Sequence, residues 1–501
     1  MNKKILKKIL PGFIIIFWIV MIGLLILQQV GFKNKTTVYK TFLSKDTLLS
    51  DSWMGIYFNS SPVGFVHSAI EPFMIKKGKS GYRITNRTFM NFFIMQKRNK
   101  VWFNAQAIVD NNYQLENFNF ELNSGMHTVN VSGEMLDKQT LQVKIDSQGN
   151  ISEKKIILPN KQGVLIASII SPFTSFGSLE VGNNYNLMVF NPFSLSLEPL
   201  EVSVLKQEII AHENQDIEVF VVKSKYRGIE QTAWVNKNGE ILKQETGLGW
   251  VLIKESPESA TRAYDAITKS DIELTQMISI AANIALPNKL LEVLNIKIKN
   301  LPDDFDIKSQ RQKIINDQDN IKTIQIRQEK FKPDKCLNLP IAEFADLKQA
   351  SVFIQADAPE IKTLAEKIIN KETNSYWAAV KINEWMFKNI AKVPVVSIPS
   401  AVDVLKTREG DCNEHSVLFA ALARAVGIPT KINVGLVSSN GRFYYHAWVS
   451  VYTGVWLDMD PTFGQNIADA GHIKLLEGDI SRQLDIIQVL GKIELEVINF
   501  Q

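Results

Sequence analysis

Three short motifs near the C-terminus hold the residues best suited to covalent chemistry. They are Thr407-Arg-Glu-Gly-Asp-Cys-Asn-Glu-His-Ser416, Tyr445-His-Ala-Trp448 and Asp458-Met-Asp-Pro-Thr462. A cysteine followed by a histidine and an aspartate can supply a thiol nucleophile, a general base and a carboxylate that orients the base. We therefore predict that Cys412 is the nucleophile, His446 the general base and Asp460 the orienting carboxylate.

The sequence around Cys412 predicts that this residue opens a helix. Asp411 and Glu414 form a capping-box pattern in which Asp411 is the N-cap. The helix should run to Val426, with Gly427 as the left-handed cap. At the first helical position the N–H groups are unpaired and the helix dipole is positive, so the thiolate is favoured over the thiol. A structural cysteine at a helix start is the alternative interpretation.

The two strands that follow predict how the histidine and the aspartate meet. A three-residue loop that ends at Gly454 would pair Val451 with Val455. In that register His446 lies directly opposite Asp460, and directly opposed residues are about 4.5–5.5 Å apart. A hydrogen bond between the two side chains is therefore expected.

Two other residues could take these roles. Asp458 lies on the same strand face as Asp460 and is the rival orienter, but the predicted register favours Asp460. His415 lies three residues after Cys412 and is the rival base. It has no carboxylate partner at an obvious spacing, so His446 is preferred.

As a set, these motifs resemble the transglutaminase-like superfamily of papain-type thiol enzymes. The resemblance is carried by Gly410-Asp-Cys-Asn-Glu-His415, Tyr445-His-Ala-Trp448, Asp460-Pro-Thr462 and the tail His472-Ile-Lys-Leu-Leu-Glu-Gly478. It spans about residues 345–480 and implies the same roles for Cys412, His446 and Asp460. It also implies an oxyanion hole made by the Cys412 backbone N–H and an upstream side chain that no motif identifies. No calcium site is carried over.

The rest of the chain predicts the elements that position these motifs. Residues 52–256 alternate in short apolar and polar runs, which indicates antiparallel sheet, with a hairpin at Asn236–Gly239. From Ala356 the period becomes helical, with helices opened by Pro359 and preceded by Ser375. We predict an α+β protein in which a papain-like transglutaminase core follows a large antiparallel β domain and an N-terminal transmembrane helix.

The N-terminal residues predict membrane attachment. An apolar run from Phe13 to Leu27, extendable to Ile9–Val30, approaches the ~20 residues that cross a bilayer. Gln28–Lys33 offers no good cleavage site, so an uncleaved anchor is favoured over a signal peptide. Four lysines precede the run: Lys3, Lys4, Lys7 and Lys8. We expect a single pass through the inner (cytoplasmic) membrane, with the body in the periplasm or outside the cell.

These patterns divide the chain into five segments. They are a flank with the anchor (1–35), a linker (36–50), an antiparallel β-sheet domain (51–256), a connecting mixed module (257–345) and a transglutaminase-like catalytic domain (346–501).

Composition limits the classes of partner. The 501 residues carry a formal net charge of +4 and no basic stripe, which argues against nucleic acid. The only cysteines are Cys336 and Cys412, so a disulfide scaffold is excluded. A bond between them would inactivate the nucleophile; otherwise Cys336 is an inert thiol. The lone His67, His127 and His212 share no ligand spacing, and no metal or cofactor is expected.

The predicted chemistry is acyl transfer on an amide of a protein or peptide substrate. If water releases the thioester, the protein is a peptidase or amidase, which is our first choice; if an amine does, it is a crosslinking transferase. The alternatives are an envelope scaffold or binding protein with a vestigial triad, and a carrier of apolar ligands in the β domain. The sequence does not specify the oligomeric state.

Overall fold

The computed structural model describes residues 50–501 apart from 77, 126, 148, 159–164, 167–178, 193, 263–273, 275–278, 288, 399 and 479. The predicted anchor (1–35), and the predicted linker up to residue 49, lie outside the described residues. Within the described part of the chain, no helix is both long and apolar enough to cross a bilayer.

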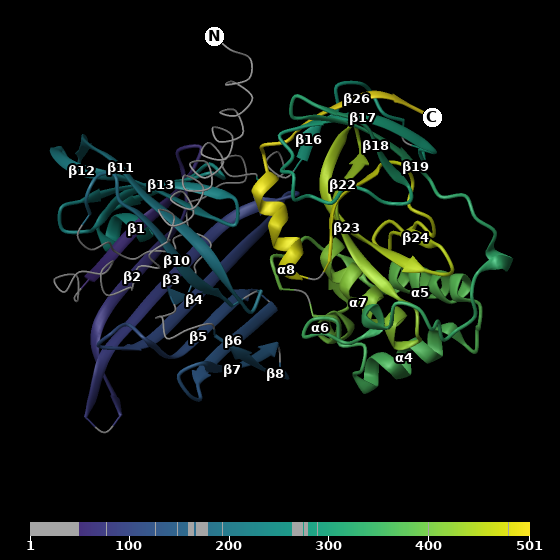
Figure 1. The fold of residues 1–501 in the computed structure, drawn as a ribbon, viewed down its shortest axis with the longest axis horizontal. Helices are drawn as coiled ribbons and strands as arrows, with labels where there is room; N and C mark the ends of the chain where they lie inside the picture. Colours follow the sequence, from purple (N-terminus) through teal and green to yellow (C-terminus); the bar gives the residue numbers. More distant parts are fainter. Residues whose placement is uncertain are drawn as a thin grey trace, which may run out of the picture.

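Residues 50–262 form a β-sheet unit built on one open sheet of fifteen strands. From the centre of the sheet, β1 to β8 follow one another in chain order to one edge. On the other side of the centre the chain order is reversed, from β15 at the centre to β9 at the opposite edge. β1 and β15 pair antiparallel in the middle, and the short pair β9 and β10 is parallel. Figure 1 shows this broad sheet on the left. The strands are β1 Ser50–Phe58, β2 Ser61–Lys76, β3 Lys79–Ile94, β4 Lys97–Asp110, β5 Leu115–Ser124, β6 His127–Met135, β7 Thr140–Ser147, β8 Asn150–Ile157, β9 Leu165–Ile166, β10 Asn184–Asn191, β11 Ser196–His212, β12 Gln215–Tyr226, β13 Ile229–Asn236, β14 Ile241–Thr246 and β15 Trp250–Lys254.

Alternation in the sequence explains this sheet. Along β6, every second residue from His127 to Gly133 is buried, because successive side chains of a strand point to opposite faces. The predicted hairpin at Asn236–Gly239 is confirmed: it joins β13 to β14, and Gly239 has a φ of +82°. A six-residue helix, α3 (Pro257–Arg262), follows the last strand.

Residues 279–501 form a C-terminal unit with two further antiparallel sheets and a layer of helices (Figure 1). One sheet has the order β16-β23-β22-β25, with β24 beside β23, and the other has the order β18-β19-β17-β26. The strands are β16 Ser279–Ala281, β17 Val293–Lys299, β18 Gln312–Gln318, β19 Ile321–Arg327, β20 Ala391–Lys392, β21 Glu409–Gly410, β22 Thr430–Ser439, β23 Arg442–Tyr452, β24 Trp456–Met459, β25 His472–Glu477 and β26 Glu494–Phe500. The helices are η3 Pro333–Lys335, η4 Ala345–Lys348, α4 Pro359–Ile369, α5 Ser375–Asn389, α6 Ala401–Thr407, α7 Cys412–Ala425, α8 Ile480–Gln483 and η5 Leu484–Val489. Taken together, the described chain is mostly antiparallel β rather than an even α+β mixture.

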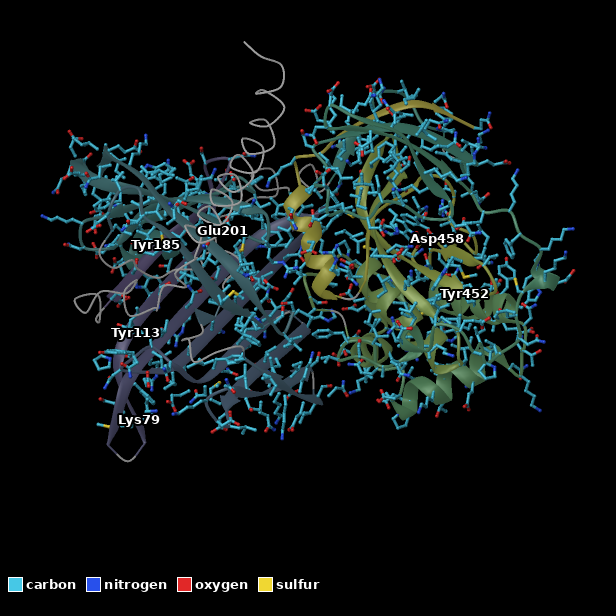
Figure 2. The ribbon with its side chains drawn as sticks, in the orientation of Figure 1. Lys79, Tyr113, Tyr185, Glu201, Tyr452 and Asp458 are labelled. Atoms are coloured by element: carbon cyan, nitrogen blue, oxygen red, sulfur yellow. The ribbon has the colours of Figure 1, made fainter. Side chains whose placement is uncertain are left out.

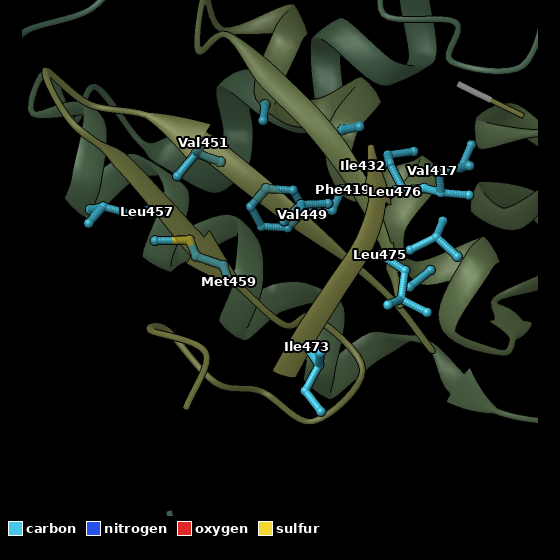
Figure 3. Packing of buried hydrophobic residues seen from close by; sticks show 14 of the residues in the cluster. Val417, Phe419, Ile432, Val449, Val451, Leu457, Met459, Ile473, Leu475 and Leu476 are labelled. Carbon is cyan, nitrogen blue, oxygen red and sulfur yellow. The ribbon is translucent and has the colours of Figure 1, made fainter. Parts of the chain in front are cut away.

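The helix α7 lies at the centre of the C-terminal unit. It contacts β22 and β23 on one side and α4, α5 and α6 on the other. Its residues from Glu414 to Ala423 are all buried, so it carries apolar side chains around most of its circumference instead of the single stripe expected of a surface helix. Figure 3 shows Phe419 of α7 and Val449 of β23 among the buried residues of one apolar cluster. The predicted packing of the Cys412 helix on an antiparallel sheet is confirmed.

One hydrophobic core runs through the whole C-terminal unit. Ile296 of β17 and Ile324 of β19 belong to the same buried cluster as Leu418 of α7. The strand β26 at the end of the chain completes the sheet of β17 to β19 by pairing with β17. The core therefore crosses the predicted boundary at residue 345, because the strands before that boundary bury their apolar faces against the elements after it.

The two units contact each other close to the Cys412 segment. Asp403 of α6 accepts hydrogen bonds from the hydroxyl of Ser147 and, at 2.7 Å, from Nδ2 of Asn150. Phe353 and Ile398 of the C-terminal unit are buried in the apolar cluster of the β-sheet unit. In Figure 2, Tyr113 belongs to the β-sheet unit, whereas Tyr452 and Asp458 belong to the C-terminal unit.

Candidate active site

Cys412 is the first residue of α7, as the sequence predicts. Asp411 is the N-cap, and its Oδ1 accepts a hydrogen bond from the backbone N–H of Asn413 at 2.9 Å. Oε2 of Glu414 accepts from the Asp411 backbone N–H at 2.9 Å, which completes the predicted capping box. The helix ends at Ala425, one residue earlier than expected, and Gly427 has a φ of +88°.

The acid strength of the Cys412 thiol differs from the prediction. Burial raises the pKa of this half-buried thiol well above its usual value, and the carboxylates of Asp411, Glu414 and Asp460 act in the same direction. The backbone N–H of Ala447 opposes them by favouring the anion. The expectation of a thiolate stabilised by the helix start is therefore wrong for the resting site, because burial and nearby negative charge outweigh the helix terminus.

His446 and Asp460 form the predicted hydrogen bond. Nε2 of His446 donates to Oδ2 of Asp460 at 2.8 Å, and the Asp460 side chain is fully buried. Oδ1 of Asp460 accepts the backbone N–H groups of Thr462 and Phe463 at 2.7 and 3.0 Å. Burial alone would raise the pKa of Asp460, but attraction to His446 and the hydrogen bonds hold it well below its usual range.

The strand register that led to this prediction is shifted by two residues. The register expected Val451 opposite Val455, whereas Val451 pairs with Leu457. A shift of two keeps each side chain on its face of the sheet. The strand β24 then ends at Met459, and the turn that follows brings the Asp460 carboxylate back to His446. Gly454 has a φ of +103°, as expected for a loop glycine.

A second histidine, which the sequence analysis did not assign to the site, holds Asp460 from the other side. Nε2 of His472 donates to Oδ2 of Asp460 at 3.0 Å, and Nδ1 donates to Oδ1 of Asp469 at 3.0 Å. Carboxylates only accept, so both ring nitrogens carry protons and His472 is an imidazolium. Burial would lower the pKa of His472, but the hydrogen bonds to Asp460 and Asp469 raise it to about 9. The spacing Asp469-x-x-His472 was the available signal in the sequence.

His446, Asp460 and His472 also have the composition of a metal-binding group. One ligand atom from each lies within 4.8 Å of the others. Those atoms, however, are the ones already joined by the hydrogen bonds from both Nε2 atoms to Oδ2 of Asp460. The N–H groups of the two histidines therefore already bind the carboxylate oxygen that a metal ion would need. The absence of a metal stays a prediction.

Comparison with known protein families finds one that matches the region of this site. The family model described as the transglutaminase-like superfamily matches residues 362–461, which include Cys412, His446 and Asp460. This chain carries a transglutaminase-like core. An uncharacterized protein of Haemophilus influenzae is 29% identical over 124 residues, which are 23% of this chain and 33% of that protein. The match thus spans about a third of the length of that relative.

Two solved structures are similar to parts of the chain. A candidate cysteine protease from Cytophaga hutchinsonii is 19% identical with a TM-score of 0.32 and covers 42% of this chain and 85% of its own. A candidate protease from Parabacteroides distasonis is 10% identical with a TM-score of 0.19 and covers 74% of this chain and 68% of its own.

The two rival residues have other partners in the transglutaminase-like core. Asp458 accepts a hydrogen bond from Nε1 of Trp448 at 2.9 Å and from the hydroxyl of Ser450, so it does not orient His446. His415 is fully buried, and its Nδ1 lies 2.7 Å from the backbone carbonyl of Asp411. Burial lowers the pKa of His415, and it faces the helix start instead of a carboxylate.

Cys336 lies apart from this chemistry. Its thiol donates to the Thr453 hydroxyl at 3.6 Å, at the turn between β23 and β24. Cys336 and Cys412 are both free thiols, so the considered disulfide between them is not formed in this structure.

Proposed function

We propose that this protein is a membrane-anchored envelope enzyme that hydrolyses amide bonds in a protein or peptide through Cys412, His446 and Asp460. The observation that carries the proposal is the 2.8 Å hydrogen bond between His446 Nε2 and the buried Asp460. That bond fixes the ring and leaves Nδ1 as the nitrogen available to the Cys412 thiol. Ala447, the residue after His446, contacts the thiol through its N–H, which brings β23 to the start of α7.

The reaction begins with a neutral thiol, because the pKa of Cys412 is raised. His446 takes the thiol proton as the sulfur attacks the amide carbonyl carbon. The oxyanion is stabilised by the backbone N–H of Cys412, which lies at the first helical position where the helix itself offers no acceptor. His446 then gives its proton to the leaving amine, the C–N bond breaks and a thioester remains.

Hydrolysis completes the cycle. His446 takes a proton from water while the water oxygen attacks the thioester carbonyl, the C–S bond breaks and the thiol is restored with the carboxylic acid as product. Asp460 stabilises the imidazolium that forms twice in the cycle, as in other triads. An amine in place of water would give a crosslinked product, so transfer remains the alternative outcome of the same site.

A non-catalytic binding or scaffold role is the second candidate. The observation that favours it is the raised pKa of Cys412, because an inert thiol is expected to be buried and protonated. In that case the hydrogen-bonded cluster around Asp460 serves only the stability of the core.

One experiment separates these functions. The full-length protein in detergent is incubated with a peptide library, and products are identified by mass spectrometry, with Cys412→Ala as the control. Cleaved or deamidated peptides that are absent with Cys412→Ala support hydrolysis, and lysine-linked peptides support transfer. No product, together with thiol alkylation that His446→Ala leaves unchanged, rejects the enzyme in favour of the scaffold.

The anchoring part of the proposal rests on the apolar run Phe13–Leu27. Alkaline carbonate extraction of membranes tests it. Retention of the protein in the pellet supports an integral anchor, and release into the supernatant overturns it.

A further inference from the structure

Lys392 lies beside the Cys412 segment. It ends the two-residue strand β20, which pairs parallel with β21, and its register partner is Gly410. The backbone N–H of Val393, the next residue, donates to the Gly410 carbonyl at 3.0 Å. Gly410 precedes Cys412 by two residues, so the backbone of Lys392 is fixed at the entrance to α7.

The side chain of Lys392 extends toward the other half of the triad. Its Nζ lies 3.8 Å from the centre of the Phe387 ring on α5. That ring packs on Gly464, where an added Cβ would be 2.7 Å from Phe387 Cδ2. The preceding residue, Phe463, stacks on His446 with ring centres 5.0 Å apart and an angle of 14°. A continuous set of contacts thus runs from Lys392 to the general base.

This edge of the site is exposed and apolar apart from the ammonium group. Phe387 and Phe463 are 42% and 43% exposed. Within the described chain, Lys392 forms no ion pair, although Asp460 acts electrostatically on its ammonium group. The carboxylates nearest the thiol, Asp411, Glu414 and Asp460, are instead held by hydrogen bonds within the protein.

We propose that Lys392, together with Phe387 and Phe463, forms a subsite that binds a carboxylate next to an apolar group of the substrate. The inference rests on the proposed function, because it concerns the specificity of the same site. Phe463 and Phe387 contact the apolar part, and the Lys392 ammonium pairs with the carboxylate. The preferred substrate is therefore an acidic peptide, with the carboxylate supplied by a side chain or by a free C-terminus.

A purely structural role for Lys392 has a different signature. The contact with the Phe387 ring is a cation–π interaction, which at exposed sites contributes only modestly to stability. Lys392→Gln would then change stability a little and leave the selectivity of the site for charge unchanged. The test must therefore read out charge selectivity at Cys412 itself.

Alkylation of the thiol gives that readout without a known substrate. Iodoacetate and iodoacetamide differ in charge but react at the same type of carbon. The first adds a carboxymethyl group to sulfur and the second a carbamidomethyl group, and each reaction releases iodide and the thiol proton. The ratio of their rates at Cys412, followed by mass spectrometry in the full-length protein at low salt, measures how well the site accepts an anion. Cys336 reports the same ratio away from the subsite.

The expected result is a selective fall in this ratio. Lys392→Gln should lower the iodoacetate-to-iodoacetamide ratio at Cys412 by about threefold or more and leave the ratio at Cys336 unchanged. Lys392→Arg should keep it, and high salt should reduce the wild-type ratio toward that of Lys392→Gln. Lys388→Gln is the matched control, because Lys388 lies on α5 beside Phe387 and pairs with Glu384 at 3.8 Å. An unchanged ratio in Lys392→Gln overturns the subsite.

Peptide pairs then identify the source of the carboxylate. Peptides that differ only by glutamate or glutamine, and peptides with a free or an amidated C-terminus, are compared with wild type and Lys392→Gln. A preference for one acidic member that is lost in Lys392→Gln supports the subsite and names the source. Cleavage without any charge preference rejects the subsite but keeps the enzyme. A failure to cleave, with Cys412 unreactive toward both reagents, rejects the proposed function instead.

Discussion

His472 donates a hydrogen bond from Nε2 to Oδ2 of Asp460 at 3.0 Å, and neither side chain is exposed. Asp460 thus lies between two histidines, the proposed general base His446 and His472, whose other ring nitrogen faces Asp469. A lone buried carboxylate would tend to take up a proton, which would remove its ability to stabilise the imidazolium of His446. The attraction of His446 and the positive charge on His472 both oppose this, so His472 acts as a positioning residue for the proposed triad.

Stability should depend on pH through His472. Its pKa is raised from 6.5 in the unfolded chain to about 9 in the fold, so the stabilisation is fully present below pH 6.5 and is lost as pH rises through about 9. The loss is on the order of 3 kcal/mol. Urea unfolding at pH 6 and pH 9.5 should show this fall for wild type and a smaller one for His472→Gln.

The matched control for that measurement is His212→Gln in the β-sheet unit, which should keep the wild-type difference between the two pH values. An equal loss of stability in wild type and His472→Gln would mean that other groups cause the pH dependence.

The thiol should become more acidic when the N-cap charge is removed. Asp411 is among the groups that raise the pKa of Cys412, after burial itself. Asparagine caps helices as well as aspartate does, so Asp411→Asn should keep α7 intact while it lowers the pKa of the thiol. The rate of iodoacetamide labelling against pH would locate the change. A curve that moves to higher pH, or does not move, contradicts the electrostatic account.

Asp460 and Asp458 should have separable effects. Asp460→Asn places an amide against two N–H donors, so we expect activity to fall by about 10²–10⁴-fold. Asp458→Asn retains an acceptor for Trp448 and should affect stability more than activity per folded molecule. Kinetics normalised to folded protein by circular dichroism test this difference. A larger loss of activity with Asp458→Asn would restore Asp458 as the orienting carboxylate.

The contact between the two units should stabilise the segment that leads to Cys412. Asp403→Ala removes the acceptor of Ser147 and Asn150, and a buried polar group left without a partner costs about 1–3 kcal/mol. Hydrogen exchange should then become faster along Ala401–Thr407. Lys406→Ala, which removes only the exposed bond to Asn150, serves as the comparison and should leave exchange almost unchanged. Equal protection in Asp403→Ala would show that the contact does not order the segment.

Local patterns in the sequence were enough to predict the nucleophile's surroundings. The capping box at Asp411 and Glu414 predicts the start of α7 because its bonds lie within four residues. The pairing of His446 with Asp460 was also predicted, although the register was wrong by two residues, because a shift of two preserves the face of each side chain. Short-range geometry of this kind does not depend on the rest of the fold.

What only the tertiary structure decided concerns charges and contacts between distant segments. The raised pKa of Cys412 depends on burial and on Asp460, which is 48 residues away in the sequence but close in space. The imidazolium at His472 and the placement of Lys392 beside Gly410 arise from sheet pairing that no local pattern specifies. Electrostatic energies depend on distance through the folded molecule, so the sequence alone determined which groups could react, and the fold determined their state of protonation and what surrounds them.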